Sequence, residues 1–328
     1  MKHLSGRDAP LFACAPWATP AALALALAIA LACAGCGKTD AAHAAPHART
    51  APKAVATAAA DKPADGLPAP HCPVTPDAAL PGPDVVGLKL GMRAQDALNF
   101  VRCRNPDVFV SFEDRWMQNL NSYGIKLGHQ MFEARAGDTS ACSYRSMSER
   151  EKCGVGNRVW THLAESITVA TPGVPGQERV LGIWRTQHFK PAAMPPVETL
   201  MQALVAKYGA AQTTIKSGDG WTRMAWVADA QGTALQPHTQ MFSQCSRINA
   251  RANEAQSWSE GCGLAITALI GSPRDNSLLA SEMSVGMVHQ QKLYEFGRTL
   301  QADLLALDQM RKHKELERAQ ASGADVKL

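Results

Sequence analysis

The sequence predicts an α+β protein with a mainly antiparallel sheet, a few packed helices and a long C-terminal helix. The prediction depends on two patterns in the chain of 328 residues. Short segments in which apolar and polar residues alternate are separated by turn signals, which is typical of strands in hairpins. A few other segments place apolar residues at the spacing of one helix face. Because several strands follow one another without a helix between them, the sheet is expected to be antiparallel.

The first half of the predicted body opens with a short strand at residues 84–92, which ends in a glycine turn. A helix is expected next, because Ala94, Ala97 and Val101 share one helix face. The polar residues 140–158 are expected to form a loop closed by a disulfide. Further strands of this half are predicted at residues 108–112, 125–131, 167–170 and 180–189.

The second half begins with the clearest helix, residues 196–208. Pro196 suits its first turn, and Gly209 can end it in the left-handed conformation. A helix over about residues 290–318 closes the body, and beyond Met310 it is mostly charged and is expected to leave the body. Its leucines recur every seven residues over too short a run for a coiled coil, so packing on the sheet is expected. Strands are predicted between the two helices at residues 213–216, 222–227, 264–270 and 279–287.

Residues 1–35 have the parts of a secretory signal peptide. Lys2 and Arg7 precede an apolar run of alanine, leucine and isoleucine at residues 21–35. The run is shorter than the about 20 apolar residues that a membrane-spanning helix needs, and alanine is only weakly hydrophobic. The alternative is an uncleaved membrane helix that reaches back to Leu11.

The end of this segment resembles the lipobox of bacterial lipoproteins, in which small residues precede a cysteine that receives diacylglycerol. Ala34 and Gly35 stand before Cys36 as that pattern requires, and the polar chain begins directly after it. Cys33 follows Ala-Leu-Ala and is the alternative lipidated cysteine. The resemblance implies a lipid anchor in the bacterial cell envelope, facing the periplasm. Neither cysteine is followed by the aspartate that retains lipoproteins at the inner membrane of enteric bacteria, which favours the outer membrane.

The cysteine count agrees with export. Of the nine cysteines, Cys14, Cys33 and Cys36 lie in the signal and anchor region, and an even number remains. In an oxidising compartment the remaining cysteines should form disulfides. The sequence leaves their connectivity open. Sequential pairing is expected because each pair then closes a modest loop: Cys72–Cys103, Cys142–Cys153 and Cys245–Cys262.

Residues 36–83 contain alanine, proline and scattered charge but no Phe, Trp or Tyr. Such a segment cannot bury enough apolar surface to fold, so it is predicted to be a disordered tether. Cys72 suggests that its last residues are attached to the body.

A helix followed by paired strands occurs twice, which favours two related modules. The predicted body then consists of a first α+β module at 84–190, a second at 191–289, the C-terminal helix at 290–318 and a disordered tail at 319–328.

The body also resembles known envelope proteins over two short segments. Residues 87–92, Gly-Leu-Lys-Leu-Gly-Met before a helix, are similar to the opening of the SmpA/BamE-type outer-membrane assembly lipoproteins. The same opening, together with a helix that ends in Lys207-Tyr208-Gly209, is similar to a set of uncharacterised proteobacterial envelope proteins. Arg93 stands where a Ser or Thr cap is usual, and the body is more than twice the size of the assembly lipoproteins. The resemblance implies an envelope lipoprotein with α+β modules and carries over no active-site residue.

The sequence carries no catalytic, cofactor-binding or metal-binding constellation that we recognise. Gly-x-Ser-x-Gly, the P-loop, the dinucleotide-binding fingerprint and His-Glu-x-x-His are all absent. His129 is expected to be a core histidine, with a ligand or catalytic base as the alternative, whereas His188 and His289 are expected at the surface. Trp221 and Trp226 are expected to be half-buried in a hairpin, and a platform for stacking sugars is the alternative.

The expected function is that of a non-enzymatic, lipid-anchored module that binds an envelope protein or cell-wall material. A formal net charge of +4 without a basic cluster gives no reason to expect nucleic acid as a partner. Within the expected class, an assembly component and an inhibitor or immunity lipoprotein both stay open. An envelope hydrolase whose catalytic residues the sequence does not reveal is the alternative from another class.

Overall fold

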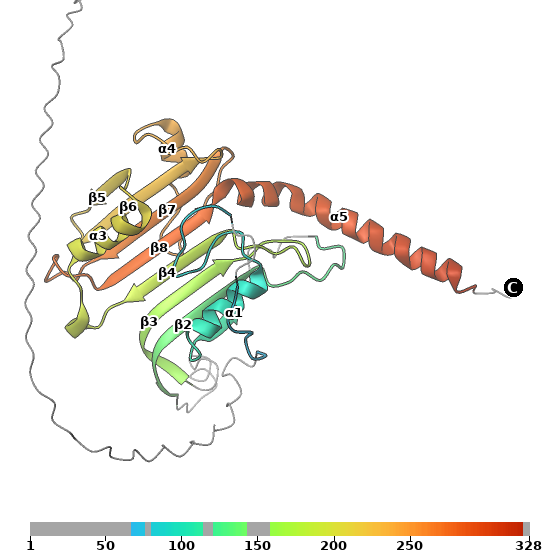
Figure 1. Ribbon diagram of the computed structural model, residues 1–328, viewed down its shortest axis with the longest axis horizontal. Helices are drawn as coiled ribbons and strands as arrows, with labels where there is room; N and C mark the ends of the chain where they lie inside the picture. The colour runs from blue at the N-terminus through green and yellow to red at the C-terminus, as the bar shows by residue number, and fades with distance from the viewer. Residues whose placement is uncertain (1–66, 76–79, 114–120, 143–157, 324–328) are drawn as a thin grey trace, which may run out of the picture. The chain divides into compact units, whose positions relative to one another are not determined.

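The computed structural model describes residues 67–75, 80–113, 121–142 and 158–323. They contain one eight-stranded antiparallel sheet in the order β1-β2-β3-β4-β8-β7-β6-β5, together with four α-helices (Figure 1). The predicted α+β class is therefore confirmed. None of the described helices is both long and apolar enough to span a membrane. The predictions for the signal peptide, for Cys33 and Cys36 and for Cys153 lie outside the described residues.

The first half of the sheet follows helix α1, Ala94–Arg104. Ala97 and Val101 of this helix are buried against the sheet, and Arg104 near its negative end binds Glu165 on the sheet at 3.0 Å. The predicted helix is therefore confirmed. The strands of this half are β1 (Phe109–Phe112), β2 (Met131–Ala141), β3 (Arg158–Ala170) and β4 (Gly182–His188).

The second half follows helix α3, Val197–Tyr208, which a short 3₁₀ turn at Pro191–Ala193 precedes. Pro196 stands directly before the first turn instead of within it. Gly209 ends the helix as predicted and has a positive φ of 84°, but its ψ of −175° is not that of the left-handed helical conformation. Its strands are β5 (Thr213–Lys216), β6 (Trp221–Asp229), β7 (Cys262–Gly271) and β8 (Glu282–His289). Helix α4 (Gln240–Cys245) lies in the connection between β6 and β7, and helix α5 (Gln290–Ala321) follows β8.

The two halves repeat one arrangement, a helix followed by four antiparallel strands. The residue before each helix also forms the same bridge: Arg93 pairs with Arg179 ahead of β4, and Pro196 pairs with Leu279 ahead of β8. The halves meet where β4 pairs with β8, from Gly182–Val288 to His188–Glu282. We call this β4–β8 pairing the seam. Both repeats therefore belong to one continuous sheet.

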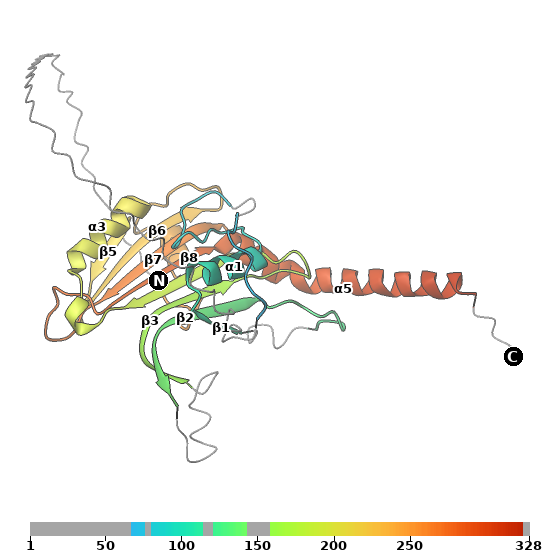
Figure 2. The same ribbon diagram turned by 60° about the horizontal axis from the view of Figure 1, so that its bottom comes forward.

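Helices α1 and α3 lie on the same side of the sheet, which we call the helix face (Figures 1 and 2). One apolar cluster fills this face and crosses the seam. It includes Val101 and Leu204 of the two helices, Ile183 and Met287 of the seam strands, and Trp226 of β6. The core thus unites the two halves.

A second apolar cluster lies on the opposite face of the sheet, under the connection between β6 and β7. We call this connection, residues 230–261, the insert. Its Phe242 and Ile248 are buried with Val288 of β8 and Leu293 at the start of α5. The disulfide between Cys245 and Cys262, with a Cα–Cα distance of 5.3 Å, ties α4 to the first residue of β7.

The end of the predicted tether is attached to α1. Cys72 forms a disulfide with Cys103 across a Cα–Cα distance of 5.9 Å, and Arg102 donates a hydrogen bond of 2.6 Å to the carbonyl oxygen of Pro68. Two of the three predicted disulfides are therefore present. The third involves Cys153, which lies outside the described residues.

Two predicted strands are wrong. Residues 84–92 form a tight turn, in which Val86 and Gly87 adopt φ values of 49° and 90° and Val85 bridges Leu88. The alternating apolar residues are buried there, but the chain reverses before it can extend. Of residues 125–131, only Met131 belongs to a strand, because the segment before it pairs with no strand.

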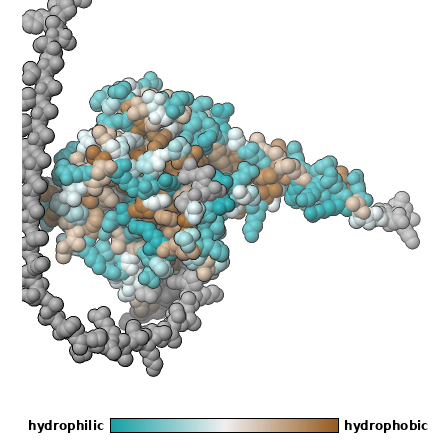
Figure 3. Space-filling view, in the orientation of Figure 1, coloured by the Kyte–Doolittle hydropathy of each residue, from teal (hydrophilic) through white to brown (hydrophobic). Residues whose placement is uncertain are grey.

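Helix α5 packs on the body only through its first part. Leu293, Leu300 and Leu304 are buried, whereas every residue from Gln309 onwards that the structure describes is exposed. Figure 3 shows hydrophilic residues over the distal part of this helix. The predicted departure from the body beyond Met310 is confirmed.

Candidate functional site

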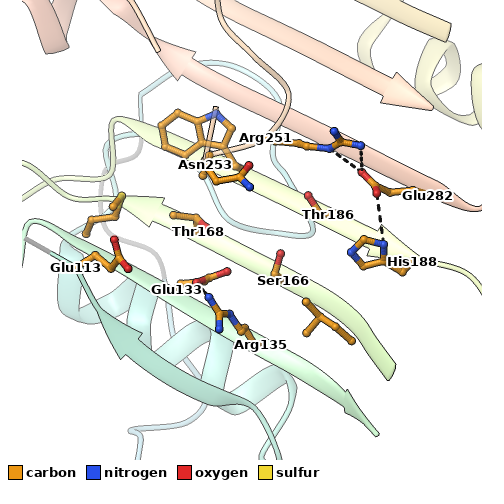
Figure 4. A pocket seen from close by; sticks show the side chains of 14 residues that line it. Glu113, Glu133, Arg135, Ser166, Thr168, Thr186, His188, Arg251, Asn253 and Glu282 are labelled. Carbon is orange, nitrogen blue, oxygen red and sulfur yellow. Dashed lines mark hydrogen bonds and ion pairs between the residues drawn. The ribbon is translucent and has the colours of Figure 1, made fainter. Parts of the chain in front are cut away.

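A cavity of about 530 Å³ lies on the sheet face opposite α1 and α3. Strands β2, β3 and β4 form its floor, and the insert and the start of β8 form one wall. The lining is Glu113, Met131, Glu133, Arg135, Leu163, Ser166, Thr168, Trp184, Thr186, His188, Arg251, Ala252, Asn253 and Glu282 (Figure 4).

Hydroxyl groups line the floor because serine and threonine occupy the alternating outward positions of β3 and β4. Thr186 exchanges a hydrogen bond of 3.0 Å with Ser284 across the seam. Ser166 and Thr168 line the cavity without a hydrogen-bond partner for their hydroxyls among the described residues. Thr168 as a whole is only 8% exposed, but its hydroxyl oxygen is not fully buried and can be reached from the cavity.

Two glutamates and an arginine lie at one end of this floor (Figure 4). Arg135 Nη2 binds Glu133 Oε2 at 2.5 Å, and this bond raises the pKa of Arg135 above its usual value. Arg135 Nε is buried and has no hydrogen-bond partner among the described residues. Glu113 forms no ion pair or hydrogen bond through its carboxylate within the same residues.

The other end of the floor holds a second charged group (Figure 4). Arg251 binds Glu282 Oε1 through Nε at 2.8 Å and Nη2 at 2.6 Å, and His188 Nδ1 lies 3.4 Å from Glu282 Oε2. The Arg251 guanidinium also lies 4.5 Å from the ring centroid of Trp221. The same ring lies against Gly271, where a Cβ atom would come within 2.3 Å of it. Trp221 is therefore held by contacts with Arg251 and with the backbone.

Side chains of the sheet hold the wall formed by the insert. Arg223 Nη2 donates to the carbonyl oxygens of Ser246 at 2.8 Å and Ile248 at 3.2 Å. Trp184 Nε1 donates to the carbonyl oxygen of Asn249 at 3.1 Å. These bonds keep the insert in place beside the cavity.

The cavity combines charged pairs with polar groups that have no partner among the described residues. Glu133 and Glu282 are both engaged by guanidinium groups, so each carboxylate is already neutralised by a partner. Among the described residues, no group of three or more His, Cys, Asp and Glu is placed to hold a metal ion. The groups left for a ligand within the same residues are the Ser166 and Thr168 hydroxyls, the Glu113 carboxylate, the Asn253 amide and the exposed part of the Arg135 guanidinium.

The structure changes four of the residue predictions. His129 is not in the core: it is exposed and its ring stacks on Phe112 with centroids 3.9 Å apart, because its predicted strand does not form. His188 does end a strand, but it is half-buried in the cavity. His289 was expected at the surface, yet it is half-buried, and this burial lowers its pKa. Trp226 lies deeper than a half-buried hairpin residue, in the main core, where its Nε1 donates to Gly209 at 2.9 Å.

Sequence analysis did not predict Arg251 and Glu282 as residues of the site, because no pattern in the sequence marks them. The glutamate comes at the start of a strand, and the arginine lies in a polar segment with no periodic pattern. Only the path of the insert over the sheet brings them together.

Comparison with protein-family models, with curated protein sequences and with solved structures returned no match to this chain. The likeness to the lipobox and to the SmpA/BamE-type lipoproteins therefore stays a prediction. A functional proposal depends on the residues of the site.

Proposed function

We propose that this protein is a lipid-anchored component of the bacterial envelope that binds a partner, without catalysis, in the cavity on the opposite face of the sheet. The proposal is supported mainly by the polar groups on the floor of this cavity. The floor presents the Ser166 and Thr168 hydroxyls, which have no hydrogen-bond partner among the described residues, and the part-exposed Arg135 guanidinium, which bonds only to Glu133 there. Buried polar groups are usually paired, so a group left unpaired beside an open cavity is a candidate contact for a ligand.

The anchor rests on the lipobox resemblance at Cys36, with Cys33 as the alternative, and on the disulfides. Disulfides form and persist in oxidising compartments such as the periplasm. The Cys72–Cys103 and Cys245–Cys262 bonds therefore support an exported protein. The intact mass of the chain purified from bacterial membranes tests the anchor. A mass that begins at Cys36 or Cys33 and includes diacylglycerol supports it, and an unprocessed N-terminus contradicts it.

Site-specific photocrosslinking tests the binding. A photoreactive amino acid replaces Asn253, which is exposed at the rim of the cavity, in the full chain in intact cells. The control carries the same group at Gln202, which is exposed on α3 across the sheet. We expect an adduct with a protein or with cell-wall material from position 253 alone. Equal or absent adducts from both positions contradict binding in the cavity.

A further inference from the structure

In the second half of the sheet, the opposite face already holds a polypeptide segment. The insert crosses that face, and the sheet binds it through main-chain carbonyl groups. Arg223 donates to Ser246 and Ile248, and Trp184 donates to Asn249. Since every polypeptide has main-chain carbonyl groups, this mode of binding needs no particular side chain in the segment that is bound.

The first half of the sheet presents a comparable donor, and no segment of the described residues is bound to it. Arg135 and Arg223 occupy the same row of paired residues, each on the third strand from the seam. The row runs Arg135, Ser166, Thr186, Ser284, Leu269, Arg223. Both arginines point to the opposite face, but Arg223 binds the insert, whereas the Arg135 guanidinium, whose side chain is 39% exposed, bonds only to Glu133 among the described residues. The cavity therefore has the donor that a main-chain carbonyl requires.

Charge in the cavity favours a cationic group on the ligand. Three glutamates and two arginines line it, and both arginines are engaged, by Glu133 and by Glu282. The remaining carboxylate, that of Glu113, forms no hydrogen bond or ion pair among the described residues, although its charge helps to raise the pKa of Arg135. An ammonium or guanidinium group beside Glu113 would neutralise it and form a charge-assisted hydrogen bond.

The aromatic residues argue against a sugar as the ligand. Proteins that bind sugars commonly stack a ring face on the sugar, and this needs an exposed ring. Trp184 is 5% exposed, with its indole packed on Gly182 and Gly286. Trp221 has the Arg251 guanidinium over its ring, lies against Gly271 and does not belong to the lining of the cavity. Neither ring offers a free face to the cavity.

We propose that the cavity binds an extended polypeptide segment that carries a basic side chain. Arg135 and the Ser166 and Thr168 hydroxyls bind its main chain, as Arg223 binds the insert, and Glu113 binds the basic side chain. This inference rests on the proposed function and names the ligand class of the same cavity.

The test measures binding of peptides to the full-length chain purified in detergent. The probes are fluorescently labelled pools of random nonapeptides, and in each pool the central residue is lysine, glutamine or glutamate. Fluorescence anisotropy measures how much of each pool is bound. We expect saturable binding that is strongest for the lysine pool. Glu113→Gln should weaken the lysine pool about ten-fold and leave the glutamine pool unchanged, because only a charge-assisted bond is lost.

Thr168→Val provides the decisive variant, and Thr267→Val is its matched control. Both threonines lie in the row that runs through Trp184 and Gly286, and both are buried. Thr267, however, does not border the cavity, and its hydroxyl is buried with no partner among the described residues. Thr168→Val should weaken peptide binding about five-fold, the loss of one hydrogen bond, and Thr267→Val should not change it. If Thr168→Val fails to fold, Asn253→Ala at the exposed rim serves in its place.

Two outcomes overturn the inference. The absence of saturable binding by every peptide pool does so, and so does an equal effect of Thr168→Val and Thr267→Val. A third arm uses oligosaccharides released from the cell wall as the probe. Binding of these sugars that depends on Thr168, without peptide binding, shows that the ligand class is wrong while the cavity still binds. Failure of the crosslinking from Asn253 would instead contradict the proposed function itself.

Discussion

Glu165 shows how a single side chain connects three elements on the helix face. Its carboxylate accepts bonds from Arg185 of β4 at 2.6 Å and from Arg104 of α1 at 3.0 Å. Burial alone would raise its pKa, but the charge of Arg185 and the bonds from both arginines outweigh burial and lower it. The carboxylate therefore stabilises the fold in its ionised form.

This lowered pKa makes part of the stability depend on pH. Since the folded pKa lies below the unfolded value of about 4.5, the contribution is fully present above that pH and is lost as the pH falls through the folded pKa. Glu165→Gln should lower the free energy of unfolding by about 1–2 kcal/mol at pH 7. Denaturant unfolding at several pH values checks this, and the difference from the original chain should vanish in acid. A difference that persists there would contradict the assignment.

The size of a single side chain also decides how closely the insert can approach the sheet. A Cβ atom at Gly286 would lie 2.7 Å from the carbonyl oxygen of Asn249 and 2.8 Å from Trp184. Gly286→Ala should therefore destabilise the fold by about 1–3 kcal/mol, the usual cost of overpacking. Gly297→Ala is the matched control, because nothing lies within 4 Å of its Cβ position in α5. The control should stabilise the helix by up to about 1 kcal/mol, and thermal unfolding of both variants measures the contrast.

At the scale of elements, the insert is the feature that the sequence predicts least. The strands β1, β4, β6 and β7 and the helices α1 and α3 follow from apolar periodicity, because each buries one face against the apolar cluster on the helix face. Helix α5 follows from the same periodicity but packs with the second cluster, and β5, which buries no residue, follows from the turn signal after it. The insert instead depends on Arg223 and Trp184, which bind main-chain carbonyls that have no signature in the sequence. The cavity could not be predicted for the same reason, because its charged residues come from segments that only the folded path brings together.

Arg223→Gln should release the insert from the sheet. Without the guanidinium, the carbonyl groups of Ser246 and Ile248 lose their donor, so the segment should open more often. Limited proteolysis should then cut residues 246–256 several-fold faster than in the original chain. Arg298→Gln serves as the control, because its pair with Glu260 is 3.7 Å long and exposed, and such pairs contribute little. Equal cleavage in both variants would contradict the role of Arg223.

At the scale of the whole molecule, the two repeats share one core. The apolar cluster on the helix face crosses the seam, and β4 and β8 pair along their length. Neither repeat can lose its structure without exposing the edge and the core of the other. The two predicted modules are therefore expected to unfold together.

Calorimetry checks this cooperativity. With the disulfides intact, the two repeats of the chain should unfold in a single heat-absorption peak. Its calorimetric and van't Hoff enthalpies should agree. Two resolved peaks, or a van't Hoff enthalpy about half the calorimetric one, would mean that the repeats are separate cooperative units. Repeating the scan with Thr186→Val, which removes a hydrogen bond at the seam, should lower the midpoint of the one peak without splitting it.

The seam has a consequence for the ancestry of this chain. Two equivalent strands that pair in opposite directions are also the contact that a two-fold homodimer makes. A shorter ancestor with one helix and four strands could have formed the same sheet from two copies of itself. In such a dimer every substitution is made twice, whereas in one chain it is made once. Fusion of the copies would have allowed one repeat to gain the insert over its face independently of the other repeat.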